Sequence, residues 1–162
     1  MKQYFKLEQN LVSRLYSLSE ESERNRAHFN LHEDYEQLVQ KTLIALTREA
    51  YIPPHYHKLK RQKELFILLA GKVKVIFFDN YGVVKDIQYL KQGDLLEVYP
   101  NIIHTVVSVS EKSLIMEIKE GPFNPDKAKE LPSWSLREQD SKSIKYLNWL
   151  YDASVGDNYD FD

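Results

Sequence analysis

The sequence predicts a mostly β domain, a sandwich or barrel of short strands, with one helix near each end. Between residues 42 and 119, short apolar runs are separated by turn residues roughly every 8 to 12 positions. No helical periodicity separates these runs, which argues against a parallel α/β sheet. Near the N-terminus, by contrast, leucines recur at spacings of four, four and three residues, which places them on one face of a helix.

The N-terminal helix is expected over residues 5–20, and the charged segment 19–26 is expected to end it. Residues 24–30 combine cationic, amide and aromatic side chains. We interpret this segment as a solvated connector that docks Phe29 on the core. The alternative is that its cationic groups bind an anionic ligand. A short helical turn is expected at 34–40.

The β region follows, and the hairpin turn Asp79-Asn80-Tyr81-Gly82 lies near its middle. Strands are expected at 42–47, 64–70, 73–77, 83–90, 95–99, 104–109 and 114–119. A second helix, with an apolar face that includes Leu147 and Leu150, is expected to pack against the outside of the barrel. The acidic end of the chain is expected to be frayed.

These elements predict a single domain over residues 1–162. We expect four parts, described by their ranges: a helical segment at 5–26, a β-barrel at about 40–120, a loop and helix at 121–151, and an acidic tail at 152–162. No internal repeat or linker divides them.

Composition and charge exclude several classes of function. The net charge is −2 and no basic stripe is present, so we expect no nucleic-acid partner. The chain has no cysteine, which excludes disulfides, thiolate zinc sites and cysteine nucleophiles. No stretch has the ~20 apolar residues of a membrane span, and the first residues do not read as a signal peptide. We therefore expect a cytoplasmic protein that does not bind membranes.

Four residues indicate a metal site. His55 and His57 are two positions apart, so on a strand both side chains point to the same face. Glu64 and His104 each begin a later apolar run. Three imidazoles and a carboxylate suit Zn, Ni, Mn or Fe and leave two open positions on an octahedral ion. The alternative is that these are ordinary surface residues, since a lone His-x-His is weak support for a metal site.

The joint spacing of these residues resembles the paired motifs of the cupin superfamily, whose fold is the jelly roll. More specifically, the chain resembles the WbuC family of cupin-fold metalloproteins. Four segments carry this resemblance: residues 24–32 (RNRAHFNLH), 54–57 (PHYH), 64–66 (ELF) and 117–125 (EIKEGPFNP). The resemblance implies that His55, His57, Glu64 and His104 are the metal ligands. It also implies an association with bacterial surface-polysaccharide (O-antigen) biosynthesis.

The sequence departs from the cupin pattern in two places. Six residues separate His57 from Glu64, where cupins usually have three or four, so the loop between these two candidate ligands is longer than in the cupin pattern. Asn101 stands where cupins usually have glycine. Asparagine tolerates a left-handed backbone better than most residues, so we expect the turn to be preserved.

Other residues are secondary candidates. Glu117 could act as a base facing inward, although we expect it to face solvent. Lys60 and Arg61, in the loop between His57 and Glu64, could attract a phosphate or carboxylate, although we expect this loop to be solvated. Arg24, Arg26, His28 and His32 could contribute to the site from the N-terminal segment. Tyr56 is expected to pack away from the ligands.

We carry three hypotheses of function. In the first, the protein is a metal-dependent enzyme for a small oxygenated substrate such as a sugar or sugar nucleotide, with isomerase, epimerase or Fe(II) dioxygenase chemistry. In the second, it is a non-catalytic module that binds a carbohydrate or organic acid. In the third, the ion only stabilises the barrel. A homodimer is expected because β-sandwiches often pair through edge strands.

Overall fold

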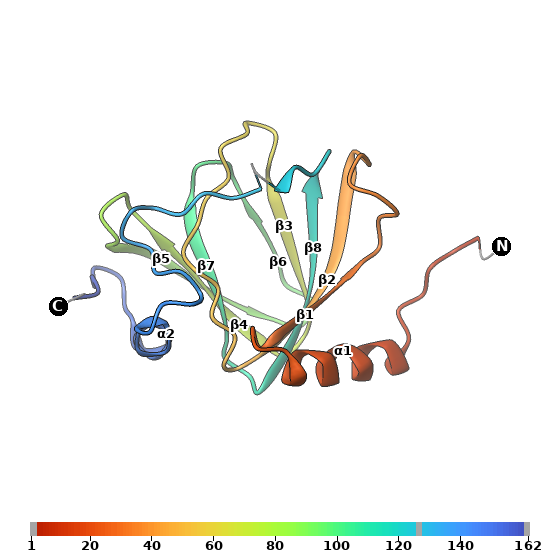
Figure 1. The fold of residues 1–162 in the computed structure, drawn as a ribbon, viewed down its shortest axis with the longest axis horizontal. Helices are drawn as coiled ribbons and strands as arrows, with labels where there is room; N and C mark the ends of the chain where they lie inside the picture. Colours follow the sequence, from red (N-terminus) through yellow and green to blue (C-terminus); the bar gives the residue numbers. More distant parts are fainter. Residues whose placement is uncertain (1–2, 126–127, 161–162) are drawn as a thin grey trace.

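Two antiparallel β-sheets face each other in the computed structural model, which describes residues 3–125 and 128–160 (Figure 1). The five-stranded sheet has this order: β1 (Arg26–Asn30), β2 (Val39–Thr47), β8 (Lys112–Glu120), β3 (Glu64–Ala70), β6 (Leu95–Val98). The three-stranded sheet has this order: β5 (Val84–Lys91), β4 (Lys72–Phe78), β7 (Ile103–Ser108). The arrangement is a jelly roll, which confirms the predicted fold class.

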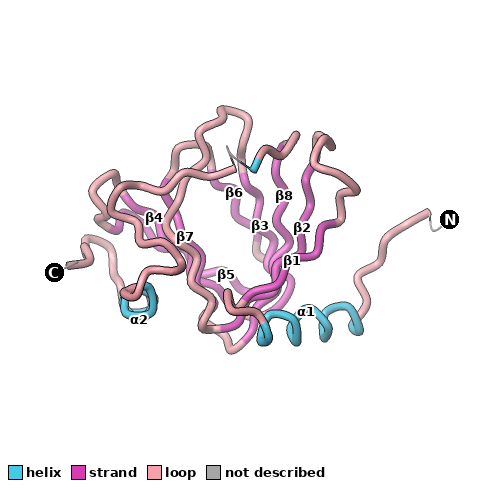
Figure 2. Tube along the Cα trace, in the orientation of Figure 1, coloured by secondary structure: helices cyan, strands magenta, loops and turns pink. Residues whose placement is uncertain are grey.

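Helix α1 (Gln9–Glu21) covers the outer face of the five-stranded sheet (Figure 2). Alternation along β2 explains this position, because Leu43 and Ala45 point outward and pack with Leu15 of the helix. Ile44 and Leu46 point the other way, into the core between the sheets. The sheet is therefore apolar on both faces at this point.

Helix α2 (Ser143–Asp152) packs on the outer face of the three-stranded sheet, as predicted (Figure 1). Leu147 and Leu150 of the helix contact Ile76 and other outward-facing residues of that sheet. Lys74 also lies on this face and is 1% exposed. Its ammonium group donates to the carbonyl oxygens of Leu150, Tyr151 and Ala153 at 2.8, 2.9 and 2.8 Å, at the C-terminal end of the helix.

The N-terminal half departs from the prediction in two places. Residues 26–30 are strand β1 rather than a solvated connector, so the β region begins near residue 26 and not near 40. Residues 34–38 form turns that lead into β2, and residues 39–40 already belong to that strand, so no helical turn forms at 34–40. Asp34 stabilises these turns through its side chain, which accepts from the backbone N–H groups of Glu36 and Gln37. This local alternative to a helical turn is typical of aspartate.

The C-terminal tail is packed as far as Tyr159, which corrects the expectation of a frayed end. Tyr159 is 9% exposed and its ring contacts those of Tyr146 and Trp149. The backbone N–H of Val84 donates to the carbonyl oxygen of Asp157 at 2.8 Å, which ties the tail to β5. The last two residues of the acidic tail, 161–162, lie outside the described residues. Among the described residues, no helix has the length and apolar character needed to cross a membrane.

Candidate metal centre

The structure brings the four predicted ligands together. His55 and His57 lie in an extended segment before β3, Glu64 begins β3, and His104 lies in β7. The backbones of His55 and His104 are hydrogen-bonded to each other in both directions, at 3.0 and 2.9 Å. One side-chain nitrogen or oxygen from each of the four residues lies within 4.8 Å of the others. The cluster joins both sheets, and all four residues are buried.

The turn before His104 is preserved, as expected. Asn101 has a φ of 64°, the left-handed conformation that glycine usually supplies. Its backbone N–H donates to the carbonyl oxygen of His57 at 2.8 Å. This turn therefore holds the backbone of one candidate ligand while it leads into the strand that carries another.

Backbone carbonyl groups fix the tautomers of the three histidines. The Nδ1 atom of His55 lies 2.9 Å from the carbonyl oxygen of Pro53, and that of His104 lies 3.0 Å from the carbonyl oxygen of Ile102. The Nδ1 atom of His57 contacts the carbonyl oxygen of Ala128. Because a carbonyl oxygen only accepts, each Nδ1 carries the proton and each Nε2 presents a lone pair.

These lone pairs face a carboxylate. The Nε2 atoms of His57 and His104 lie 2.7 and 3.0 Å from Oε2 of Glu64. All three atoms are buried, and none has a hydrogen-bond partner among the described residues. Lone pairs at this separation repel each other unless a cation or a proton lies between them. The donor set of imidazole nitrogens and one carboxylate oxygen therefore fits a divalent metal ion.

Two pKa shifts leave these groups in the forms that bind a metal ion. Burial, followed by the nearby His104, holds the pKa of His55 well below its usual range, which keeps that imidazole neutral. Burial alone would raise the pKa of Glu64, but the Lys119 ammonium holds it well below its usual range. Neutral imidazoles and an ionised carboxylate are the forms that bind metals.

Lys119 connects the cluster to a second carboxylate. Its ammonium group lies 2.7 Å from Glu64 Oε1 and 3.0 Å from Glu117 Oε1. Burial lowers the pKa of Lys119, but the carboxylates of Glu117 and Glu64 outweigh burial, and the pKa is raised above its usual value. Burial raises the pKa of Glu117, against the effect of Lys119. Glu117 faces inward, and the expectation that it faces solvent was wrong.

The cluster opens into a cavity of about 490 Å³ between the sheets. Its size lies in the range of small-molecule sites. The cationic and polar residues of its wall include Arg24, Arg26, His28, Asn30, His32, Gln40, Thr42, Glu117, Lys119 and Lys129. Apolar residues from both sheets, among them Ile44, Phe66 and Val106, complete the lining. Glu117 therefore lies in the same cavity as the candidate ligands.

The other candidates separate into two groups. Arg24, Arg26 and His28 line the cavity. Lys60 and Arg61 are exposed and are not part of the cavity wall, as expected of a solvated loop. Sequence reasoning missed Lys119 and Lys129. Alternation of Lys119 with Glu117 could have indicated the first, whereas no local pattern marks the second.

Two similar solved structures, each with a TM-score above 0.5, support the fold. A recombinant oxalate oxidase in complex with glycolate has a TM-score of 0.53 and 12% identity, over 68% of this chain and 56% of that one. The DMSP lyase DddQ from Ruegeria pomeroyi DSS-3 has a TM-score of 0.52 and 16% identity, over 67% of this chain and 53% of that one. A cupin superfamily protein from Desulfitobacterium hafniense DCB-2 has a TM-score of 0.48 and 17% identity, over 59% of this chain and 76% of that one.

The fold is a jelly roll, and the buried cluster within it is a candidate metal centre. The chain belongs to the family described as a domain of unknown function, DUF6016, whose model matches residues 7–90. The sequence has no match among curated proteins.

Proposed function

We propose that this protein is a metal-dependent enzyme of the cupin superfamily, an isomerase or epimerase that acts on a small oxygenated substrate such as a sugar or sugar nucleotide. The observation that carries the proposal is the group of unpaired lone pairs on His57, Glu64 and His104, which adjoins a cavity large enough for such a substrate. His55 completes the ligand set. A divalent ion bound there supplies Lewis-acid polarisation of a substrate carbonyl or hydroxyl group.

Glu117 is the proposed acid–base residue. It lines the cavity, and its raised pKa makes the carboxyl group a stronger base than an exposed glutamate. The Lys119 ammonium fixes its orientation through a contact of 3.0 Å. In this role Glu117 removes a proton from a substrate carbon and returns it, as an isomerase or epimerase requires.

Two further atoms in the wall suit a hydroxylated ligand. Nε2 of His32 and Oε1 of Gln40 are buried and have no hydrogen-bond partner among the described residues. Both residues line the cavity. A buried polar atom without a partner is costly, so a ligand hydroxyl group at either one would be stabilising. This supports a sugar-like substrate, and with it the proposed relationship to WbuC proteins of surface-polysaccharide biosynthesis.

The test follows hydrogen exchange at carbon. Metal-loaded protein is incubated in D₂O with a panel of sugars, sugar nucleotides and 2-hydroxy acids, and proton NMR follows the C–H signals. We expect one substrate class to lose a C–H signal, with the loss abolished by chelation and strongly reduced in Glu117→Gln. The structurally similar oxalate oxidase holds glycolate, which is why acids are included.

Three other outcomes would contradict the proposal. Oxygen consumption that requires Fe(II), without exchange, would identify a dioxygenase. A ligand that raises the melting temperature and is recovered unchanged and unexchanged would identify a binding module. Unfolding on chelation, together with no ligand at any concentration, would identify a structural ion. The homodimer and the cytoplasmic location stay predictions.

A further inference from the structure

Strand β1 and the residues that flank it present a row of polar side chains to the cavity. Five residues at alternate positions line it: Arg26, His28 and Asn30 of β1, with Arg24 before the strand and His32 after it. The residues between them face the other way, and Ala27 and Leu31 pack in the cluster beneath α1. The period of two is that of a strand with one face on a core. Here, however, the face that lines the cavity is polar, and Arg26 and His32 within it are buried, which requires an explanation beyond folding.

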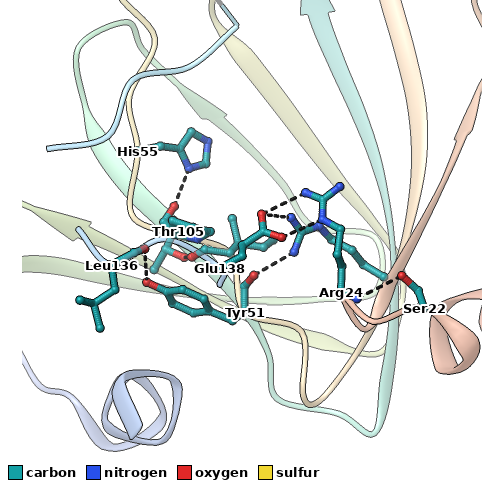
Figure 3. A network of polar contacts seen from close by, with 10 residues as sticks. Ser22, Arg24, Tyr51, His55, Thr105, Leu136 and Glu138 are labelled. Atoms are coloured by element: carbon teal, nitrogen blue, oxygen red, sulfur yellow. Dashed lines mark hydrogen bonds and ion pairs between the residues drawn. The ribbon is translucent and has the colours of Figure 1, made fainter. Parts of the chain in front are cut away.

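The first two residues of the row share a single carboxylate. Arg24 donates to Glu138 through Nε at 2.7 Å and through Nη2 at 3.0 Å, and Arg26 donates to the same carboxylate at 2.5 Å (Figure 3). Burial alone would raise the pKa of Glu138, but hydrogen bonds from Arg24 and the charge of Arg26 lower it to about 2. Glu138 is therefore ionised, and the three groups together carry a net charge of +1.

Arg26 is also fixed from the opposite side. A second nitrogen of its guanidinium, Nη1, donates to the carbonyl oxygen of Tyr51 at 2.8 Å. The Tyr51 hydroxyl in turn donates to the carbonyl oxygen of Leu136 at 2.9 Å (Figure 3). The side chain of Arg26 is only 4% exposed. Its position is set before any ligand arrives, which lowers the entropic cost of binding.

Lys129 adds a third cation to the same part of the wall. It lines the cavity and forms no ion pair with another described residue. The combined field is evident at His28: desolvation, followed by Arg26, Arg24, Lys119 and Lys129, lowers its pKa to about 4. His28 is thus neutral at pH 7. Arg24, Arg26 and Lys129, opposed by Glu138 alone, leave a net charge of +2 at this end of the cavity.

We propose that this cationic end of the cavity, formed by Arg24, Arg26 and Lys129, binds an anionic group, a carboxylate or a phosphate, of the ligand. The inference rests on the proposed function, in which a small molecule occupies this cavity, and it adds that the molecule is an anion. The Arg26 side chain is buried, Arg24 and Lys129 are exposed, and the positive charge of the three exceeds that of their one carboxylate partner. An anion in the cavity neutralises this excess. Guanidinium groups also match the geometry of carboxylate and phosphate oxygens.

The test compares two double variants that remove the same charge. Arg24→Gln/Lys129→Gln alters the cavity wall and leaves the buried Arg26 in place. Lys60→Gln/Arg61→Gln alters the exposed loop outside the cavity. Inorganic phosphate, malonate and uncharged glycerol are titrated calorimetrically into each protein, first as purified with its metal and then after chelation. Circular dichroism confirms the fold of each variant.

In the parent, phosphate or malonate should bind at one site per chain and glycerol should bind far more weakly. The cavity variant should bind the anion at least about ten-fold more weakly, as the loss of charge-assisted hydrogen bonds predicts. The loop variant should stay within about two-fold of the parent, since exposed charges contribute little. The better of the two anions identifies the group as phosphate or carboxylate.

The inference would be overturned if no anion bound, if the cavity variant bound as tightly as the parent, or if both variants lost the same affinity. The titrations of chelated protein distinguish failure of the anionic subsite from failure of the proposed function. Anion binding that persists in protein that takes up no metal would retain the anionic subsite and reject the metal-dependent enzyme. Metal uptake without anion binding would reject the anionic subsite and retain the metal-dependent enzyme.

Discussion

The interior of the sandwich has two halves built from the same strands. On β2, the inward-facing residues Ile44 and Leu46 belong to the core and form apolar lining of the cavity, whereas Gln40 at the other end of the strand contributes polar lining. On β8, Ile115 packs in the core while Lys119 reaches Glu64 of the candidate metal centre. Each row changes from apolar to polar along its length. One half is closed by packing and the other is open to a ligand.

The difference shows how a single domain separates stability from binding. Burial of apolar area stabilises the closed half by about 25 cal/mol per Å² without any specific partner. The open half buries charged and polar groups, which destabilise the fold unless each has a partner. Lys119 and the two carboxylates satisfy one another in part, while His57 and His104 retain unpaired nitrogens. The missing partners are what we assign to a metal and a ligand.

The largest expected effect is a loss of metal affinity, and it should differ between the two carboxylates of the open half, Glu64 and Glu117. Glu64→Gln removes the only carboxylate of the candidate ligand set, so metal affinity should fall by more than about 100-fold, since loss of an outer partner alone costs 10- to 100-fold. Glu117→Gln keeps that set intact and should change metal affinity by about ten-fold at most. Competition with a chelating dye measures both. Equal losses in the two variants would place Glu117 among the ligands and undermine the assignment.

The closed half should respond in stability rather than in metal binding. Leu68 is 1% exposed, and Leu68→Ala should lower the free energy of unfolding by about 3 kcal/mol because it leaves a cavity in the core. Metal content per folded chain should not change. Urea denaturation of chelated protein gives the first quantity and elemental analysis gives the second. Metal loss from the folded variant would mean that the two halves are not independent.

Lys74 is a buried charged group on the face of the three-stranded sheet that α2 covers. Its ammonium donates to three carbonyl oxygens at the end of that helix. Lys74→Met keeps much of the side-chain volume but leaves those acceptors without their donor, which should cost about 2 kcal/mol of unfolding free energy. Thermal and urea unfolding both report the change. A fully stable variant would show that water replaces the ammonium without cost.

The smallest expected effect is the pH dependence of stability that comes from His28, which lies in the open half. The pKa of His28 is about 4, below its ordinary value of 6.5, because of desolvation and the surrounding cations. The folded state therefore binds fewer protons than the unfolded state between these values. The contribution of His28 to stability is present above about pH 6.5 and is lost as the pH falls towards 4. NMR of the imidazole in parent and His28→Gln protein measures the titration, and a midpoint near 6.5 would refute the cationic environment.

The two halves also differ in how far the sequence predicts them. Strands of the closed half carry alternating or continuous apolar residues, and the predicted ranges for β3, β5 and β7 agree with the structure to within one or two residues. The histidine pair could be read locally, because a spacing of two on an extended segment fixes its direction. Glu64 and His104 were indicated by their positions at the start of apolar runs and by the resemblance of the joint spacing to cupin motifs.

Strand β1 was missed for a physical reason. Its inward face is polar, so it lacks the apolar run by which a strand is usually recognised, although Arg24, Arg26 and His28 already show the period of two. The contact of Lys119 with Glu64 depends on the register of β8 against β3, which pairs these two residues. Such a register is a property of the assembled sheet, and no local pattern in the sequence specifies it.

The central claim is that His55, His57, Glu64 and His104 bind a metal ion, and metal content per chain tests it most directly. The parent should contain, or take up from Zn, Ni, Mn or Fe(II), about one ion per chain, as a single cluster of this kind binds. A folded His55→Ala/His104→Ala variant should contain none, while His32→Ala should keep the parent's value, because His32 lies outside the cluster. A parent that binds none of these ions, or a double variant that still binds one, would contradict the account.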